Sequence, residues 1–133
     1  MRLLPAIIAT TLGAFAHAAL SGEIQLTGAE EVPAVTTSAT GTANITINAD
    51  KSVSGSVKTQ GIKGIAAHVH QAPAGKNGPP IITLVKSSDD VWSVPEGAKL
   101  TDEQYASYQA GELYINVHSA EHKSGEIRAQ LRP

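Results

Sequence analysis

Polar and apolar residues alternate along most of the chain after residue 22, with the period of two that is typical of half-buried β-strands. Turn residues separate these segments, most densely between Gln71 and Pro80, where three prolines and two glycines indicate a loop. Short strands at regular spacing, divided by turns, predict an all-β sandwich or barrel. The predicted strands are Glu23–Thr27, Thr42–Ile47, Val53–Thr59, Ala66–His70, Ile81–Val85, Glu112–Ser119 and Glu126–Arg132.

One segment departs from this pattern and predicts a short helix inside a long connection, from about Asp89 to Gly111. Thr101 and Gln104 have the spacing of a capping box, which is typical of the start of a helix. Tyr105 and Tyr108 follow on one face of this helix. The favoured interpretation is that both tyrosines pack the helix on the sandwich, and the alternative is that they line a substrate site.

The first 18 residues have the features of a secretory signal peptide. A positively charged start is followed by the apolar run Leu3–Phe15 and by the cleavage site Ala16-His17-Ala18. The apolar run is shorter than the roughly 20 residues that a membrane span needs. Cleavage would leave one domain, residues 19–133, in the periplasm or secreted, with no membrane-bound part. A second frame, Ala14-Phe15-Ala16, would make His17 the first residue of the mature chain.

The composition excludes several kinds of site and partner. The chain has no cysteine, so the domain has no disulfide, and a metal site in it cannot use thiolates. Removal of the leader leaves nine basic and 12 acidic residues, a net charge of −3. Because nucleic-acid binding requires a basic patch, no nucleic-acid partner is expected.

The histidines are the candidate site. His68 and His70 lie two residues apart on a strand and therefore share one face, while Ile65, Ala67 and Val69 are expected to face the core. His118 ends a later strand on the face opposite its apolar residues, and His122 follows in a turn. Imidazole suits copper, zinc, iron and nickel. We therefore expect these four histidines to converge on one metal, with solvated surface histidines as the alternative.

Three blocks of the sequence resemble the chordin-type domain, CHRD. The resemblance extends from about Gly22 to Leu131 and departs at Ala129, where the family usually has glycine. Such domains occur in bacterial exported proteins and in animal developmental antagonists. The blocks are Leu26–Pro33, Ala67–His70 with Ala74–Pro79, and Gly111–His118 running into Gly125–Leu131.

A local resemblance points to a cofactor. His68-Val69-His70, followed by a loop of glycine, asparagine and proline, is similar to the copper-binding strand of copper–zinc superoxide dismutases. It implies a Greek-key, immunoglobulin-like or superoxide-dismutase-like sandwich in which His68, His70 and a later histidine bind copper. It also implies an arginine at the mouth, a role that Arg128 could take. The loop Gln71–Pro80 has no histidine or aspartate, so the zinc site of those enzymes is not expected.

These observations favour a copper-only superoxide dismutase, in which Arg128 on the outward face of its strand would attract the superoxide anion. Lys123 and Lys76 are the other candidate cations, and a surface ion pair with Glu126 or Glu112 is the alternative for Arg128. Two other functions stay open: a non-catalytic copper or zinc protein for storage or delivery, and a metal-free interaction module. The sequence does not decide between copper and zinc, nor the oligomeric state.

Overall fold

The computed structural model describes residues 22–133, and the predicted signal peptide lies outside these residues. In this part of the chain, strands predominate and one α-helix occurs. None of the described helices is long and apolar enough to cross a membrane. The elements are β1 (Ile24–Leu26), the 3-10 helix η1 (Gly28–Glu30), β2 (Thr40–Ile47), β3 (Val53–Gln60), β4 (Gly64–Gln71), β5 (Pro80–Thr83), β6 (Val85–Ser88), β7 (Val91–Ser93), α1 (Asp102–Gln109), β8 (Leu113–Ser119) and β9 (Ile127–Leu131).

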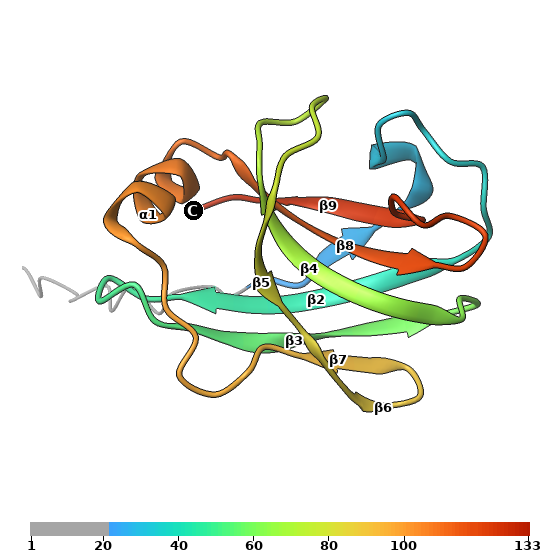
Figure 1. Cartoon of the computed structure of the whole chain (residues 1–133), viewed down its shortest axis with the longest axis horizontal. Helices are drawn as coiled ribbons and strands as arrows, with labels where there is room; N and C mark the ends of the chain where they lie inside the picture. The colour runs from blue at the N-terminus through green and yellow to red at the C-terminus, as the bar shows by residue number, and fades with distance from the viewer. Residues whose placement is uncertain (1–21) are drawn as a thin grey trace, which may run out of the picture.

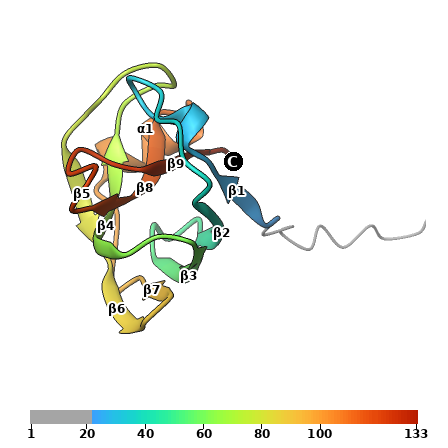
Figure 2. The ribbon, with the colours of Figure 1, turned by 90° about the vertical axis from the view of Figure 1, so that its right-hand side faces the viewer.

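Two antiparallel sheets pack against each other (Figure 1, Figure 2). One has the strand order β1-β2-β3-β7-β6, and the other has the order β5-β4-β8-β9. The prediction of an all-β sandwich with one short helix is confirmed. Strands β4 and β8, which carry three of the candidate histidines, are neighbours in the centre of the four-stranded sheet.

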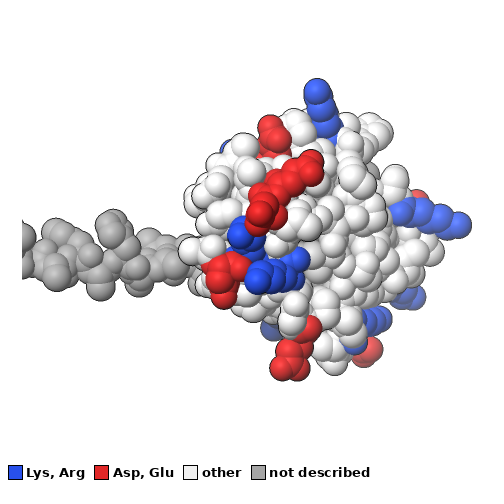
Figure 3. Space-filling view, turned by 60° about the vertical axis from the view of Figure 1, so that its left-hand side comes forward, with Lys and Arg blue, Asp and Glu red and all other residues white. Residues whose placement is uncertain are grey.

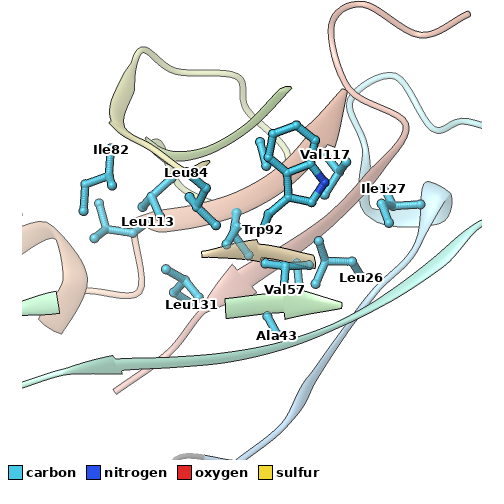
Figure 4. Close-up of a cluster of buried hydrophobic side chains, with 14 of the residues drawn as sticks. Leu26, Ala43, Val57, Ile82, Leu84, Trp92, Leu113, Val117, Ile127 and Leu131 are labelled. Carbon is cyan, nitrogen blue, oxygen red and sulfur yellow. The ribbon is translucent and has the colours of Figure 1, made fainter. Parts of the chain in front are cut away.

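The core lies between the sheets, where apolar side chains from both layers meet (Figure 4). Ala67, Val69, Ile115 and Val117 are at most 1% exposed, as the alternation of β4 and β8 predicts. Trp92 of β7 is 5% exposed and fills space between the layers. Burial of each large apolar side chain contributes about 1.5–3 kcal/mol to stability, so this core holds the two sheets together.

The strand prediction is wrong between Ile81 and Ser93. The apolar run Ile81–Val85 was expected to form one strand, but it is divided between β5 of one sheet and β6 of the other. The chain crosses between the sheets at Leu84, which is 3% exposed in the core. Strand β7 then lies inside the segment expected to be a connection, because three residues are too few to show a period.

Ile65 also departs from prediction, since its side chain is 56% exposed rather than facing the core. The pairing of β4 with β8 shifts register between Gly64 and Ala66. A bulge of this kind inserts an extra residue and reverses the alternation beyond it. The faces of His68 and His70, on the other side of the bulge, are unaffected.

The helix prediction is confirmed. Thr101 Oγ1 accepts a hydrogen bond from the backbone N–H of Gln104, and the Gln104 side chain accepts one from the backbone N–H of Thr101. Tyr105 and Tyr108 are partly buried against the core, as the packing interpretation required. Lys51 Nζ lies 2.8 Å from the Asp102 carboxylate and links the helix to the β2–β3 turn.

Candidate metal centre

Three of the candidate histidines come together on the outer face of the four-stranded sheet. In the antiparallel pairing of β4 with β8, His68 lies opposite Asn116, His70 opposite Tyr114, and His118 opposite Ala66. The side chains of all three histidines lie on the face opposite the core. One ring nitrogen from each lies within 4.8 Å of the others, and His68 Nδ1 is 3.0 Å from His118 Nε2. The spacing suits nitrogens that share one ion, because metal–nitrogen bonds are near 2.0–2.1 Å for zinc.

Backbone carbonyl groups orient two of these rings. His70 Nδ1–H donates to the carbonyl of Gly78 at 2.9 Å, and His118 Nδ1–H donates to the carbonyl of Lys123 at 2.8 Å. These bonds assign the proton to Nδ1 in both rings, so each Nε2 is an unprotonated acceptor. Ligating histidines are held in this way in metalloproteins, where the second ring nitrogen donates to a carbonyl or carboxylate.

His70 Nε2 is buried and has no hydrogen-bond partner. Leaving such an acceptor unpaired costs about 1–3 kcal/mol, and native proteins rarely do so without a functional reason. A metal ion in contact with this nitrogen would remove the cost. The unpaired nitrogen is therefore a second observation, independent of the ring spacing, that fits a metal site.

Burial lowers the pKa of both His68 and His70 below the usual value for histidine. The neighbouring His118 lowers the pKa of each further, because a second positive charge nearby would be repelled. The carbonyl of Gly78 acts in the opposite direction on His70, but desolvation is the larger effect. Both rings are therefore neutral at pH 7, which is the state that binds metal.

Tyr114 packs against His70, and Arg128 packs against Tyr114. The rings of His70 and Tyr114 are stacked, with centroids 4.7 Å apart and planes 1° from parallel. The guanidinium carbon of Arg128 lies 3.4 Å from the centroid of the Tyr114 ring. The backbone N–H of Gly78 donates to the Tyr114 hydroxyl at 3.2 Å. Tyr114 therefore contacts both the His70 ring and the loop residue that orients this ring.

A family model of the CHRD domain matches residues 23–131. The chain belongs to the CHRD family. The match confirms the resemblance read from the sequence and includes every residue of the site described above. No similar chain was found among curated proteins or among solved structures.

The CHRD domain does not expose Arg128 on its surface, contrary to the position expected for it. The side chain is 1% exposed and donates to the carbonyl of Lys76 at 2.7 Å and to Asn77 Oδ1 at 3.2 Å. The alternative, an ion pair of Arg128 with Glu126 or Glu112, is not found among residues 22–133, where the Glu126 carboxylate accepts from the hydroxyls of Thr37 and Ser119. Strand alternation places Arg128 on the outer face correctly, but the Gln71–Pro80 loop covers that face.

His122 does not join the other three histidines of the CHRD domain. It lies in the turn between β8 and β9, where its ring nitrogen groups with carboxylate oxygens of Glu121 and Glu126. The backbone N–H of His122 donates to Ser119 Oγ at 3.1 Å, and its carbonyl accepts from Gly125. The prediction of four convergent histidines is therefore corrected to three, His68, His70 and His118.

Two buried polar residues beside the three histidines were not identified as site residues from the sequence. Asn116 is 1% exposed, and its Nδ2 donates to Glu31 Oε2 at 3.5 Å. Burial raises the pKa of Glu31 to about 7, although Asn116 and Arg128 both favour the ionised carboxylate. The alternation of polar and apolar residues in β8 places Asn116 on the face of His118, and this pattern could have identified Asn116 as a site residue. Nothing in the sequence indicated that Glu31, 85 residues away, would contact it.

Proposed function

We propose that this CHRD domain binds one copper ion through His68, His70 and His118. The main support is the convergence of three ring nitrogens. In His70 and His118, Nδ1–H donates to a backbone carbonyl, which leaves Nε2 unprotonated and able to bind a metal. In the third ring, His68 Nδ1 lies 3.0 Å from His118 Nε2, and this nitrogen could act as a ligand only with the ring proton on His68 Nε2. Zinc is the alternative ion, because an all-imidazole site accepts both metals.

Metal binding is tested with the purified domain, residues 19–133, loaded with copper or zinc and then dialysed. We expect one copper per chain, and we expect His70→Ala and His118→Ala to reduce affinity by at least about 100-fold. His122→Ala is the matched control, because it removes a histidine outside the group. Copper retained by both ligand variants, or lost equally in the control, would contradict this assignment.

The second candidate is superoxide dismutation by the copper-loaded domain. Two superoxide anions and two protons would give one O2 and one H2O2, and bound copper would supply the one-electron exchange. This candidate is supported by His68, which is only partly buried and leaves one side of the site open to solvent. If superoxide could not reach the bound copper, the domain would serve copper storage or delivery instead.

A small anion would need a local cation near this open side. On the face shown in Figure 3, positive and negative side chains are interspersed over a mostly uncharged surface. Since Arg128 is buried, the best candidate is the exposed Lys123, whose own carbonyl holds His118. Electrostatic attraction of this kind raises association rates by roughly 10- to 1000-fold.

Turnover is measured as superoxide decay at matched concentrations of copper-loaded domain and of free copper ions. We expect Lys123→Glu to slow the reaction several-fold at low salt, with the difference shrinking as screening increases. Lys58→Glu, on β3 of the other sheet, makes the same change of net charge and should have little effect. Absence of turnover above free copper would support the storage function.

The predicted leader also supports export to the periplasm or beyond the cell. Sequencing the N-terminus of the mature protein from the native host should give Ala19. A start at His17 would instead add an amine and an imidazole that can chelate copper. An uncleaved Met1 would contradict export by this leader.

A further inference from the structure

Asn116 lies at the centre of the face that carries the histidines. It is two residues from His118 on β8 and directly opposite His68 on β4. Its side chain therefore shares the face of both rings. At 1% exposure it is among the most buried residues of the domain. A buried carboxamide needs hydrogen-bond partners, whereas an apolar residue at the same position would need none.

The two ends of the Asn116 carboxamide differ in their partners. The Nδ2 group lies 3.5 Å from Glu31 Oε2 and donates to it, so Oδ1 is on the side of the amide away from this carboxyl group. The Oδ1 atom is buried and has no hydrogen-bond partner. The only other buried side-chain polar atom without a partner, among residues 22–133, is His70 Nε2.

These two orphaned atoms belong to the same site. Asn116 lies opposite His68, and His70 is the next residue of β4 on the same face, so Asn116 and His70 are diagonal neighbours across the two strands. With the Nδ1 proton of His70 donated to Gly78, both Nε2 and Oδ1 are acceptors without a donor. A cation between these two neighbouring acceptors would satisfy both.

We propose that Asn116 Oδ1 is an oxygen ligand of the same metal that His68, His70 and His118 bind. This inference rests on the proposed metal site and completes it as three nitrogens and one neutral oxygen. A carboxamide oxygen can act as a weak axial ligand of copper, as glutamine does in some blue-copper sites. Such a ligand favours Cu(II) over Cu(I), because oxygen is a harder donor than imidazole.

The test compares Cu(II) binding by the wild-type domain with binding by Asn116→Leu, which has nearly the same shape and lacks the oxygen. Affinity is measured by competition with a chelator, and the ligand set by electron paramagnetic resonance. We expect the leucine variant to bind Cu(II) at least about tenfold more weakly and to give a changed spectrum. Gln130→Leu is the matched control, because this amide on β9 donates to Ala72 and Gly111 instead.

A second variant, Asn116→Asp, keeps an oxygen in place and adds a charge. It should bind Cu(II) at least as tightly as wild type, with a spectrum shifted by the anionic donor. It also keeps the proposal testable if the leucine variant does not fold, which circular dichroism would reveal. Wild-type affinity and spectrum in the folded leucine variant would overturn the inference, as would weaker binding with an unchanged spectrum. Failure of the wild type to bind copper would instead refute the metal site itself.

Discussion

The buried carboxyl group of Glu31 makes a quantitative prediction about stability. Burial raises its pKa from 4.5 to about 7, so the folded domain binds this proton more tightly than the unfolded chain does. The resulting stabilisation is complete below pH 4.5 and is lost as pH rises through 7. A difference of about 2.5 pKa units corresponds to roughly 3 kcal/mol at pH 8 and above, since each unit is about 1.4 kcal/mol.

Glu31→Gln removes this titration while keeping the size of the side chain. The neutral amide resembles the protonated acid, so we expect the variant to match wild type near pH 4 and to exceed it by about 3 kcal/mol at pH 8. Urea unfolding of the metal-free domain, with a chelator present, measures both curves. The difference between the two proteins isolates Glu31, because His68 and His70 titrate in both.

The opposite result would refute the reasoning. If Glu31→Gln were destabilising at pH 8, the ionised carboxylate would be worth more to Asn116 and Arg128 than its desolvation costs. A constant difference between pH 5 and pH 8 would show that Glu31 does not titrate in this range. Exposed Glu23→Gln is the control and should change the unfolding free energy by less than about 0.5 kcal/mol at any pH.

Two further predictions concern the loop over the site and the metal itself. Arg128→Met should lower the unfolding free energy by about 2–4 kcal/mol and make the Gln71–Pro80 loop more sensitive to protease, because loop acceptors lose a buried donor. The control, Arg132→Met at an exposed position, should change neither stability nor protease sensitivity. A stable, protease-resistant Arg128→Met would contradict the structural role of Arg128. Copper affinity should fall steeply below about pH 6, where protons compete for three ligand rings, as measured by chelator competition from pH 7.5 to 4.5. An affinity that stays constant to pH 4.5 would point to carboxylate or backbone ligands.

The strand alternation predicted much of this site from local sequence. It placed Ala67 and Val69 in the core and put His68 and His70 on the opposite face, because side-chain direction in a strand depends only on position. It could not predict that β5 and β6 belong to different sheets, since Leu84 is apolar in either arrangement. The bulge at Ile65 was also invisible, because a register shift depends on the partner strand.

Alternation predicts a face but not what covers it, and this distinction explains the error at Arg128. The outward face of β8 and β9 was expected to meet solvent, yet Tyr114, Asn116 and Arg128 are each at most 2% exposed. Asn77 Nδ2 donates to the carbonyl of Val32, which joins the Gln71–Pro80 loop to the segment after η1. Because long-range contacts of this kind assemble the cover, only the folded chain reveals that Arg128 supports the loop.

The same cover explains why the site has the chemistry of a buried centre with one open side. Burial favours the neutral form of His70 and shields its Nε2 from solvent, while His68 stays partly accessible. A fully solvated histidine pair would have neither property, since water would satisfy each nitrogen and stabilise the protonated rings. The loop that hides Arg128 from an incoming anion thus also orients and buries His70. If copper binds here, Arg128→Met should therefore weaken binding through the orientation of His70, rather than through any change in attraction at the surface.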